Sequence, residues 1–304
     1  MFSTPPDAEL YIELILQRCR DLIESTIWQD LHVQRLNSWF GNFLSKEDKY
    51  FAARVLDNLI YRPRLQTLAL IDYLFVRSLP EAANRLSGSA ATIDDWITPF
   101  GRHTAHESVR FIPVIRSIDP PTKSGPLVAR MVKRHLQIDD SNFVWPDQIE
   151  NALEHGASVF VFLDDFVGTG DQFIKFFRTN NFDTYANDAT FIYAPFVAHA
   201  EGVKSIRAFN PRILVTFAEL LDGRQQLFSD CCDCFNDEQN SRVDALAHYH
   251  ELIEKIGLKS SLAERVWLGY GQLALAFSFS HASPNNSLPL LWWRGPNFVP
   301  LFDR

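Results

Sequence analysis

The sequence predicts an α/β fold in which helices flank a parallel sheet, preceded by an N-terminal helical module. The run Val159–Leu163 is apolar without alternation, which is typical of a strand covered on both faces. From Val109 onward, short apolar runs alternate with segments of helical spacing, and this order favours parallel strands joined by right-handed crossovers. Before that point the apolar residues follow helical spacing alone. We therefore expect a helical module at 1–95 and an α/β domain at 96–304.

Helices dominate the predicted N-terminal module. Asp7 can cap the first, because it directly precedes an apolar face of helical period. Ser45 can cap the second, which we expect to end at Arg62 because a residue before proline avoids the helical region. A third helix is expected over 65–75. The module shows no basic recognition helix, which favours docking to a partner over contact with DNA.

Strands and helices are expected to alternate through the α/β domain. Strands are predicted at 109–115, 159–163, 190–197, 212–219 and 273–279. Helices are predicted at 124–132, 147–155, 173–178, 201–209 and 242–256. The polar, acidic segment 221–242 is interpreted as an excursion from the sheet.

Composition restricts the class of protein. The chain has 304 residues, 46% of them hydrophobic, which suffices for one large core and a smaller satellite. A net charge of −8 disfavours a surface that binds nucleic acid all over, although it leaves room for a local basic groove. No apolar run approaches the roughly 20 residues of a membrane span. The N-terminus also lacks the pattern of a signal peptide. We therefore expect a cytoplasmic protein without a membrane partner.

The cysteines do not suggest a framework of disulfides. Cys19 stands alone, and Cys231, Cys232 and Cys234 cluster in the polar excursion. Their spacing fits neither a disulfide scaffold nor a standard zinc site. This pattern favours structural thiols and leaves metal or redox use as the alternative.

An acid pair and a glycine turn follow the apolar run. Asp164 and Asp165 fall where the strand is expected to end, at the edge where open α/β sheets bind ligands. Gly168 and Gly170 let the backbone approach an anion, and the next helix begins there with free N–H groups. Carboxylates accept ribose hydroxyls, while the Thr169 hydroxyl and the N–H groups suit a 5′-phosphate. The pattern predicts a ribose 5-phosphate site, the alternative being acids that merely cap the helix.

The segment Asp164–Gln172 resembles the phosphoribosyl pyrophosphate motif of type I phosphoribosyltransferases, with its acid pair, two apolar residues and Thr-Gly loop. The resemblance implies that Asp164 and Asp165 are the catalytic pair under the ribose. It assigns the 5′-phosphate to Gly168, Thr169, Gly170, Asp171 and Gln172. It assigns the pyrophosphate side to a loosely matching loop of Lys123, Ser124 and Gly125. It also implies magnesium, held mainly by the diphosphate and water. Gly168 and Gln172 depart from the usual hydroxyl residues of the motif.

A narrower resemblance covers more of the chain. Leu163–Gln172, the Ser124–Gly125 helix start and the tail Pro284–Trp292 resemble phosphoribosyltransferase-like effectors of bacterial conflict systems, including some retrons. This likeness implies an anti-phage effector with a partner such as a reverse transcriptase, and contact with nucleic acid through that partner. Asn285 and Asn286 follow the last predicted strand, where this fold carries a flap over the acceptor. Their amides suit a base edge, and an ordinary Pro-Asn turn is the alternative.

Other functions stay open at this point. The same pocket could serve a nucleotide-sensing or toxin subunit without transferase activity. Leu163–Gly170 also resembles the cofactor loop of amino DNA methyltransferases, and Asp119–Thr122 imitates their catalytic motif. Against this likeness, Thr122 offers no aromatic face for a flipped base. A second carboxylate, Asp165, also replaces the proline of that loop.

Overall fold

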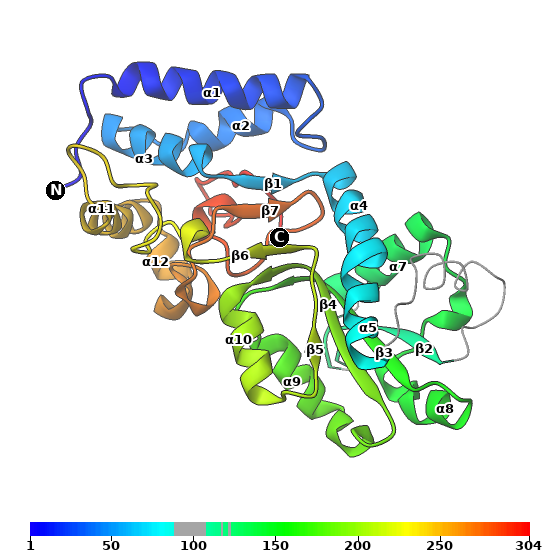
Figure 1. The fold of residues 1–304 in the computed structure, drawn as a ribbon. Coiled ribbons are helices and arrows are strands. Elements are labelled where there is room, and N and C mark those ends of the chain that lie inside the picture. The colour runs from blue at the N-terminus through cyan, green and yellow to red at the C-terminus, as the bar shows by residue number, and fades with distance from the viewer. Residues whose placement is uncertain (88–107, 117, 121–122) are drawn as a thin grey trace. The chain divides into compact units, whose positions relative to one another are not determined.

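The computed structural model describes residues 1–87, 108–116, 118–120 and 123–304 (Figure 1). Two compact units divide the chain. The first, here called the terminal unit, consists of Met1–Gln66 and Asp222–Arg304, and the second, the sheet unit, is Thr67–Leu221. The boundary that we expected at 95–96 lies outside the described residues. The units divide instead after Gln66 and after Leu221, because the N-terminal helices share a core with the C-terminal segment.

The described part of the sheet unit is built on a five-stranded parallel sheet, which confirms the predicted fold class. Its strands are β2 (Val109–Pro113), β3 (Val159–Val167), β4 (Thr190–His199), β5 (Leu214–Val215) and β6 (Glu219–Leu221). The strands β2, β3, β4 and β5 lie in that order, and β6 also pairs with β4. The single strand expected over 212–219 is therefore two short strands that pair in turn with β4.

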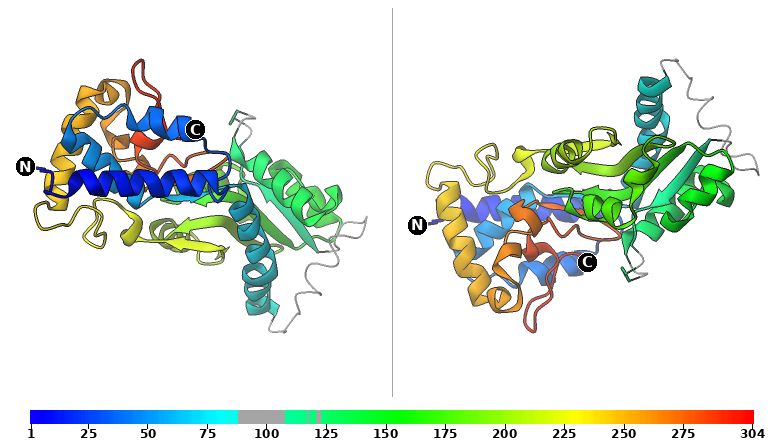
Figure 2. Two further views of the ribbon diagram at one scale, coloured as in Figure 1. Left: turned by 90° about the horizontal axis from the view of Figure 1, so that it is seen from above. Right: turned by 90° about the horizontal axis from the view of Figure 1, so that it is seen from below.

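Helices flank this sheet (Figures 1 and 2). The α-helices are α4 (Arg64–Tyr73), α5 (Leu79–Ser87), α7 (Ser124–Leu136), α8 (Ile149–Glu154), α9 (Asp171–Thr179) and α10 (Ala200–Phe209). A π-helical turn (Leu74–Ser78) joins α4 to α5, and short 3-10 turns cover Asp140–Asn142, Pro146–Gln148 and Phe182–Tyr185. Aromatic residues from α9 pack around Phe162 of β3 on one face. On the other face Phe75 contacts Phe111, with ring centroids 5.4 Å apart.

The terminal unit also contains helices. They are α1 (Ala8–Glu24), α2 (Val33–Phe40), α3 (Lys46–Asp57), α11 (Arg242–Lys255) and α12 (Leu258–Ser261), with 3-10 turns at Gly223–Gln225, Glu264–Val266, Tyr270–Gln272 and Pro289–Leu291. The Ser45 hydroxyl caps α3 by accepting a hydrogen bond from the Asp48 N–H at 3.1 Å, as predicted. Asp7 precedes α1 but makes no side-chain cap bond.

The second predicted helix is shorter than expected. It ends at Asp57, and Ile60–Arg62 instead forms strand β1, which pairs in parallel with β7 (Phe277–Phe279). The Ile60 N–H donates to the Ala276 carbonyl at 2.8 Å. Pairing with a distant segment thus overrides the local helical pattern. The strand expected over 273–279 likewise narrows to β7, and it belongs to this two-stranded sheet rather than to the larger one.

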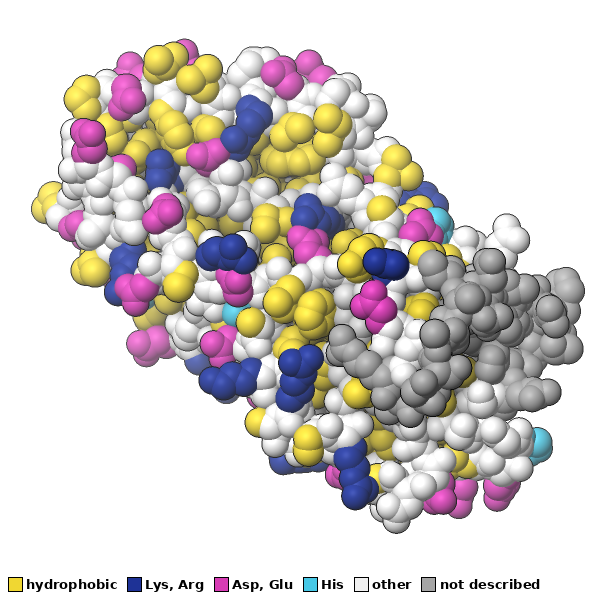
Figure 3. All heavy atoms as spheres, viewed as in Figure 1, with side chains coloured by type: hydrophobic (Ala, Val, Ile, Leu, Met, Phe, Trp, Pro, Cys, Tyr) yellow, Lys and Arg dark blue, Asp and Glu magenta, His cyan; other side chains and the backbone are white. Residues whose placement is uncertain are grey.

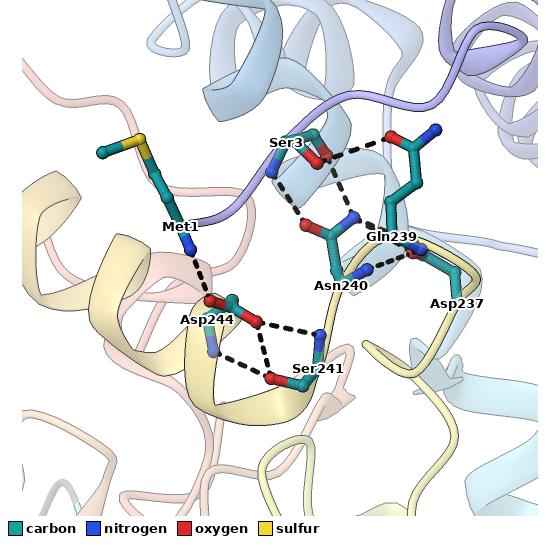
Figure 4. A network of polar contacts seen from close by, with 7 residues as sticks. All are labelled: Met1, Ser3, Asp237, Gln239, Asn240, Ser241 and Asp244. Carbon is teal, nitrogen blue, oxygen red and sulfur yellow. Dashed lines mark hydrogen bonds and ion pairs between the residues drawn. The ribbon is translucent and has the colours of Figure 1, made fainter.

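The first residues bind the 237–244 segment of the same unit (Figure 4). The Met1 ammonium lies 2.6 Å from Asp244 Oδ1. Ser3 and Asn240 form two hydrogen bonds, one from the Ser3 N–H at 2.8 Å and one from the Asn240 amide to the Ser3 carbonyl at 3.0 Å. The Phe2 ring stacks on His248, with centroids 4.9 Å apart. These contacts explain why both ends of the sequence contribute to one core.

All four cysteines are free thiols. Cys19, Cys232 and Cys234 are buried in the terminal unit, and Cys231 is exposed. A hydrogen bond with Cys234 lowers the pKa of the Cys232 thiol to about 7, against the opposing effect of burial. Among the residues that the structure describes, no three His, Cys, Asp or Glu side chains gather as a metal site.

Charged side chains of both signs are interspersed over the face shown in Figure 3. This distribution fits the modest net charge of −8. None of the described helices is long and apolar enough to cross a membrane.

Candidate functional site

The predicted residues of the sheet unit meet at one edge of its sheet. Because β2, β3 and β4 are parallel, their carboxyl ends open on the same side. Asp164 and Asp165 lie in β3, the bend Gly168–Gly170 follows it, and Asp171 and Gln172 begin α9. Lys123 precedes α7, whose first residues are Ser124 and Gly125. The predicted phosphate turn (Gly168–Gln172, here called the phosphate turn) and the predicted pyrophosphate-side loop (Lys123–Gly125) thus follow neighbouring strands.

The acid pair lies inside the strand rather than after it. Strand β3 pairs with β2 only as far as Leu163, whereas its pairing with β4 continues to Val167. Asp164 and Asp165 therefore stand in the extended part of β3, just beyond the end of β2. Both side chains are buried, with exposed fractions of 2% and 8%.

Asp164 points into the aromatic core on the α9 side. Its Oδ1 accepts a hydrogen bond from the Asp165 N–H, and its Oδ2 accepts one from the Tyr193 hydroxyl, both at 3.0 Å. The Tyr193 ring stacks on Phe173 of α9, with centroids 3.8 Å apart. Burial, reinforced by the neighbouring Asp165 carboxylate, raises the pKa of Asp164 well above its ordinary value of 3.8. The Asp164 carboxyl therefore stays protonated to a higher pH than an ordinary aspartate.

Strand alternation directs Asp165 toward the opposite face of the sheet, and its carboxyl also interacts with that of Asp164. Asp165 Oδ1 accepts a hydrogen bond from the Phe166 N–H at 3.0 Å. Leu163 shares this face and pairs with Pro113, which lines a cavity together with Pro126 of α7. Asp165 is thus the acid on the side of α7 and its loop. The two acids, equivalent in the sequence motif, occupy different environments.

The glycine turn is held by a close approach to α10. Gly170 has a φ of +86°, a left-handed conformation that favours glycine. A Cβ atom on Gly202 of α10 would lie 2.5 Å from the Gly168 carbonyl oxygen. Glycine at position 202 therefore permits the first turn of α10 to pack directly on the phosphate turn.

Thr169 and Asp171 bind one another within the turn. The Thr169 hydroxyl donates to Asp171 Oδ2 at 2.9 Å, and the Asp171 N–H donates to the same hydroxyl at 3.4 Å. An acid in the first turn of α9 also interacts favourably with the helix dipole. A phosphate at this turn would need the Thr169 hydroxyl to exchange its carboxylate acceptor for a phosphate oxygen.

The loop between β2 and α7 contains an ion pair. Arg116 Nη2 lies 2.6 Å from Asp119 Oδ1, and Arg116 Nε donates to Asp119 Oδ2 at 3.1 Å. These bonds hold the pKa of the Asp119 carboxyl below its usual range. Thr122 lies outside the described residues. Since Asp119 is engaged by an arginine, it lacks the free carboxylate that the methyltransferase likeness would use.

Asn285 and Asn286 belong to the terminal unit. The Asn286 amide donates to the Tyr270 carbonyl at 2.8 Å, and the Tyr270 N–H donates to the Asn285 carbonyl at 2.7 Å. The Ser287 N–H donates to the Pro284 carbonyl at 3.1 Å, so the segment forms the Pro-Asn turn named above as the alternative. A role as acceptor flap stays a prediction.

Sequence reasoning missed Tyr193 and Gly202. Tyr193 lies inside an apolar strand, where a buried hydroxyl requires a polar partner, and that requirement was the available signal. Gly202 lies in the first turn of a helix, where glycine is unfavourable unless another backbone comes close. Neither signal identifies the partner, because Asp164 and Gly168 are distant along the chain.

The comparison with protein families agrees with this geometry. A family model described as PRTase-CE matches residues 36–304, which include the whole sheet unit and most of the terminal unit. The chain belongs to the PRTase-CE family. PRTase-CE proteins are phosphoribosyltransferase-like, so the family supports the likeness of the Asp164–Gln172 motif. No curated protein gives a significant sequence match.

Asp164→Asn in this PRTase-CE protein is expected to change how stability depends on pH. The folded pKa is raised, so the protonated carboxyl contributes stability that is complete below about pH 4 and is lost as pH rises through the folded pKa. Asparagine does not titrate. The variant should therefore gain stability relative to wild type between pH 4 and pH 8. Denaturant unfolding across that range measures the difference. Asp188→Asn, which removes an exposed carboxylate of the same unit, is the control. A difference for Asp164→Asn that is constant with pH would contradict the assignment.

Proposed function

We propose that this PRTase-CE protein binds phosphoribosyl pyrophosphate, or a related ribose phosphate, at the Asp164–Gln172 loop. The observation that carries the proposal is the position of this loop. Two acids and a left-handed glycine turn follow one another at the carboxyl edge of a parallel sheet, beside the loop that begins α7. Family membership supports a phosphoribosyltransferase-like ligand.

In this proposal the acids have separate roles. Asp165, on the α7 side, accepts a ribose hydroxyl. Asp164, held by Tyr193, fixes the strand beneath the sugar. The Gly168–Gln172 backbone and the Thr169 hydroxyl receive the 5′-phosphate, and Lys123 with the Ser124–Gly125 helix start faces the pyrophosphate.

Magnesium would enter with the diphosphate. Both Asp164 oxygens already accept hydrogen bonds, so this side chain is a poor direct metal ligand. Magnesium retains several waters and usually binds one or two carboxylates together with phosphate oxygens. These preferences fit an ion that the substrate carries.

If the site transfers the sugar, an acceptor nucleophile forms a bond to the anomeric carbon. The bond to pyrophosphate breaks, and pyrophosphate leaves with the electron pair. Positioning of the ribose and stabilisation of the charges on both sides lower the barrier. The acceptor is not specified by the fold.

The wider role that we propose is that of a cytoplasmic effector in bacterial anti-phage defence. The resemblance of the Ser124–Gly125 helix start and the Pro284–Trp292 tail to such effectors supports it. The helices α1, α2 and α3 would dock a protein partner such as a reverse transcriptase, which could bring nucleic acid.

A nucleotide sensor without transfer activity is the second candidate. The same turn would hold the phosphate of a sensed nucleotide without any transfer step. The methyltransferase interpretation is set aside, because Asp119 is paired with Arg116 and the family is phosphoribosyltransferase-like.

Calorimetric titration with phosphoribosyl pyrophosphate and magnesium tests the proposal. Wild type should bind, and Asp165→Asn should weaken binding roughly tenfold or more, since a hydrogen bond to a charged group contributes about 1.5–3 kcal/mol. The double variant Asp164→Asn/Asp165→Asn should not bind. Absence of binding by wild type, or equal binding by the double variant, would overturn the proposal. Release of pyrophosphate with nucleobases as acceptors then separates a transferase from a sensor.

A further inference from the structure

A cavity of about 320 Å³ lies beside α7 in the sheet unit, away from the phosphate turn. Its floor is apolar and its rim carries an indole and two cations. The lining consists of Pro113, Pro126, Ala129, Arg130, Lys133, Asp140, Phe143, Val144 and Trp145. The volume is at the lower end of the range for small-molecule sites.

Trp145 supplies an exposed aromatic face. Its side chain is 51% exposed, whereas Trp28, Trp39, Trp292 and Trp293 are buried. Its indole N–H donates no hydrogen bond to the residues that the structure describes. Its backbone is nevertheless fixed, because the Trp145 N–H donates to Gln148 Oε1 at 2.8 Å and the preceding N–H donates to the Phe111 carbonyl at 3.0 Å. The backbone that carries the exposed ring is therefore fixed by hydrogen bonds.

Arg130 supplies the free positive charge. It is exposed on α7 and forms no ion pair or hydrogen bond with the residues that the structure describes. Lys133 is neutralised by Asp140, since Nζ and Oδ1 lie 2.5 Å apart. Helix α7 contains no acid, so the rim keeps the net charge of Arg130. An anion is favoured beside the ring.

These features select one class of ligand. The apolar floor and the indole favour a planar ring, which a small inorganic anion lacks. The guanidinium favours a phosphate, which a neutral ring lacks. We propose that this cavity binds a nucleotide, with the base stacked on Trp145 and the phosphate paired with Arg130. The Asp140 carboxylate offers an acceptor to a ribose hydroxyl.

The cavity shares no lining residue with the site of the proposed function, which it adjoins at Pro126, the residue after Gly125. Arg130 lies six residues after Ser124, about 9 Å further along the helix axis. Base stacking on an aromatic side chain combined with a cation is a recognition mode for free nucleotides and for single strands alike. The proposal therefore does not depend on ribose binding at Asp164 and Asp165.

Binding is measured in the Asp164→Asn/Asp165→Asn background, so that the central site contributes nothing. The probe is adenosine 5′-monophosphate in equilibrium dialysis. Trp145→Ala should weaken binding about tenfold or more, because base stacking of this kind has that effect. Trp145→Phe should retain most of the affinity. Arg130→Gln should also weaken binding about tenfold. Arg134→Gln removes an exposed cation of α7 outside the cavity and should leave affinity unchanged.

Two further probes define the ligand. Ribose 5-phosphate lacks the base and should not bind. A five-nucleotide single strand that binds at least tenfold more tightly than the mononucleotide identifies a nucleic-acid segment as the source, and equal affinity identifies a free nucleotide. Loss of nucleotide binding in the double-variant background, or binding unaffected by Trp145→Ala, would overturn the proposal. The first of these results would still leave the central site supported.

Discussion

Gly202→Ala is expected to lower the free energy of unfolding by about 1–3 kcal/mol and to weaken ligand binding at the phosphate turn. The new Cβ would lie 2.5 Å from the Gly168 carbonyl oxygen and 2.9 Å from Val167 Cγ2. The first of these atoms belongs to backbone, so no change of rotamer relieves the contact. Either α10 or the turn must move. Denaturant unfolding and titration with phosphoribosyl pyrophosphate measure the two effects.

Gly223→Ala is the matched control for this substitution. The nearest atom to its added methyl group is the Cys231 Cβ at 3.5 Å, an ordinary contact. Its stability should stay near that of wild type. Equal unfolding of the Gly202 variant and wild type would show that α10 can withdraw from the turn without cost.

Gly269→Ala is expected to be the most destabilising of these changes, by about 2–5 kcal/mol. Gly269 has a φ of +78°, and a Cβ there would lie 2.5 Å from the Asn286 carbonyl oxygen and 2.8 Å from that of Ser287. Backbone strain and overpacking therefore add. The substitution should release the Pro-Asn turn from the Tyr270 segment, and denaturant unfolding with limited proteolysis measures the loss.

Gly257→Ala tests a positive-φ glycine without crowding, with a ψ of 10° at Gly257 and of 165° at Gly269. Gly257 has a φ of +80°, but a Cβ there meets nothing within 4 Å. This variant should show the backbone cost alone, about 1–2 kcal/mol. If both variants lost the same stability, crowding against Asn286 would contribute nothing and the close approach would be relaxed in solution.

The fold could be predicted wherever the local pattern and the tertiary contacts agree. Val159–Leu163 became the centre of a parallel sheet because its apolar side chains have core on both faces. Ser45 starts a helix through its own side chain. The helix predicted through Ile60–Arg62 was wrong, because these residues form a strand that depends on pairing with β7, more than two hundred residues away. The local sequence around Ile60 does not indicate such long-range pairing.

The sequence predicted which residues lie together at the candidate site, but not how their side chains are arranged. The motif placed Asp164 and Asp165 together, and the structure keeps them together at the expected edge. The motif could not distinguish the two acids, because their environments differ through Tyr193 on one face of the sheet and α7 on the other. Nor could it show that Thr169 binds Asp171.

The discontinuity of the terminal unit has a consequence for synthesis. The sheet unit is one continuous segment inserted between the two parts of the terminal unit. Domains fold as units while the chain emerges from the ribosome, N-terminal parts first. In the folded protein the Trp39 indole donates to the Leu290 carbonyl at 2.7 Å. This hydrogen bond can form only after Leu290 has been synthesised. The inserted segment is therefore complete before α1, α2 and α3 can pack against the C-terminal part of their own unit.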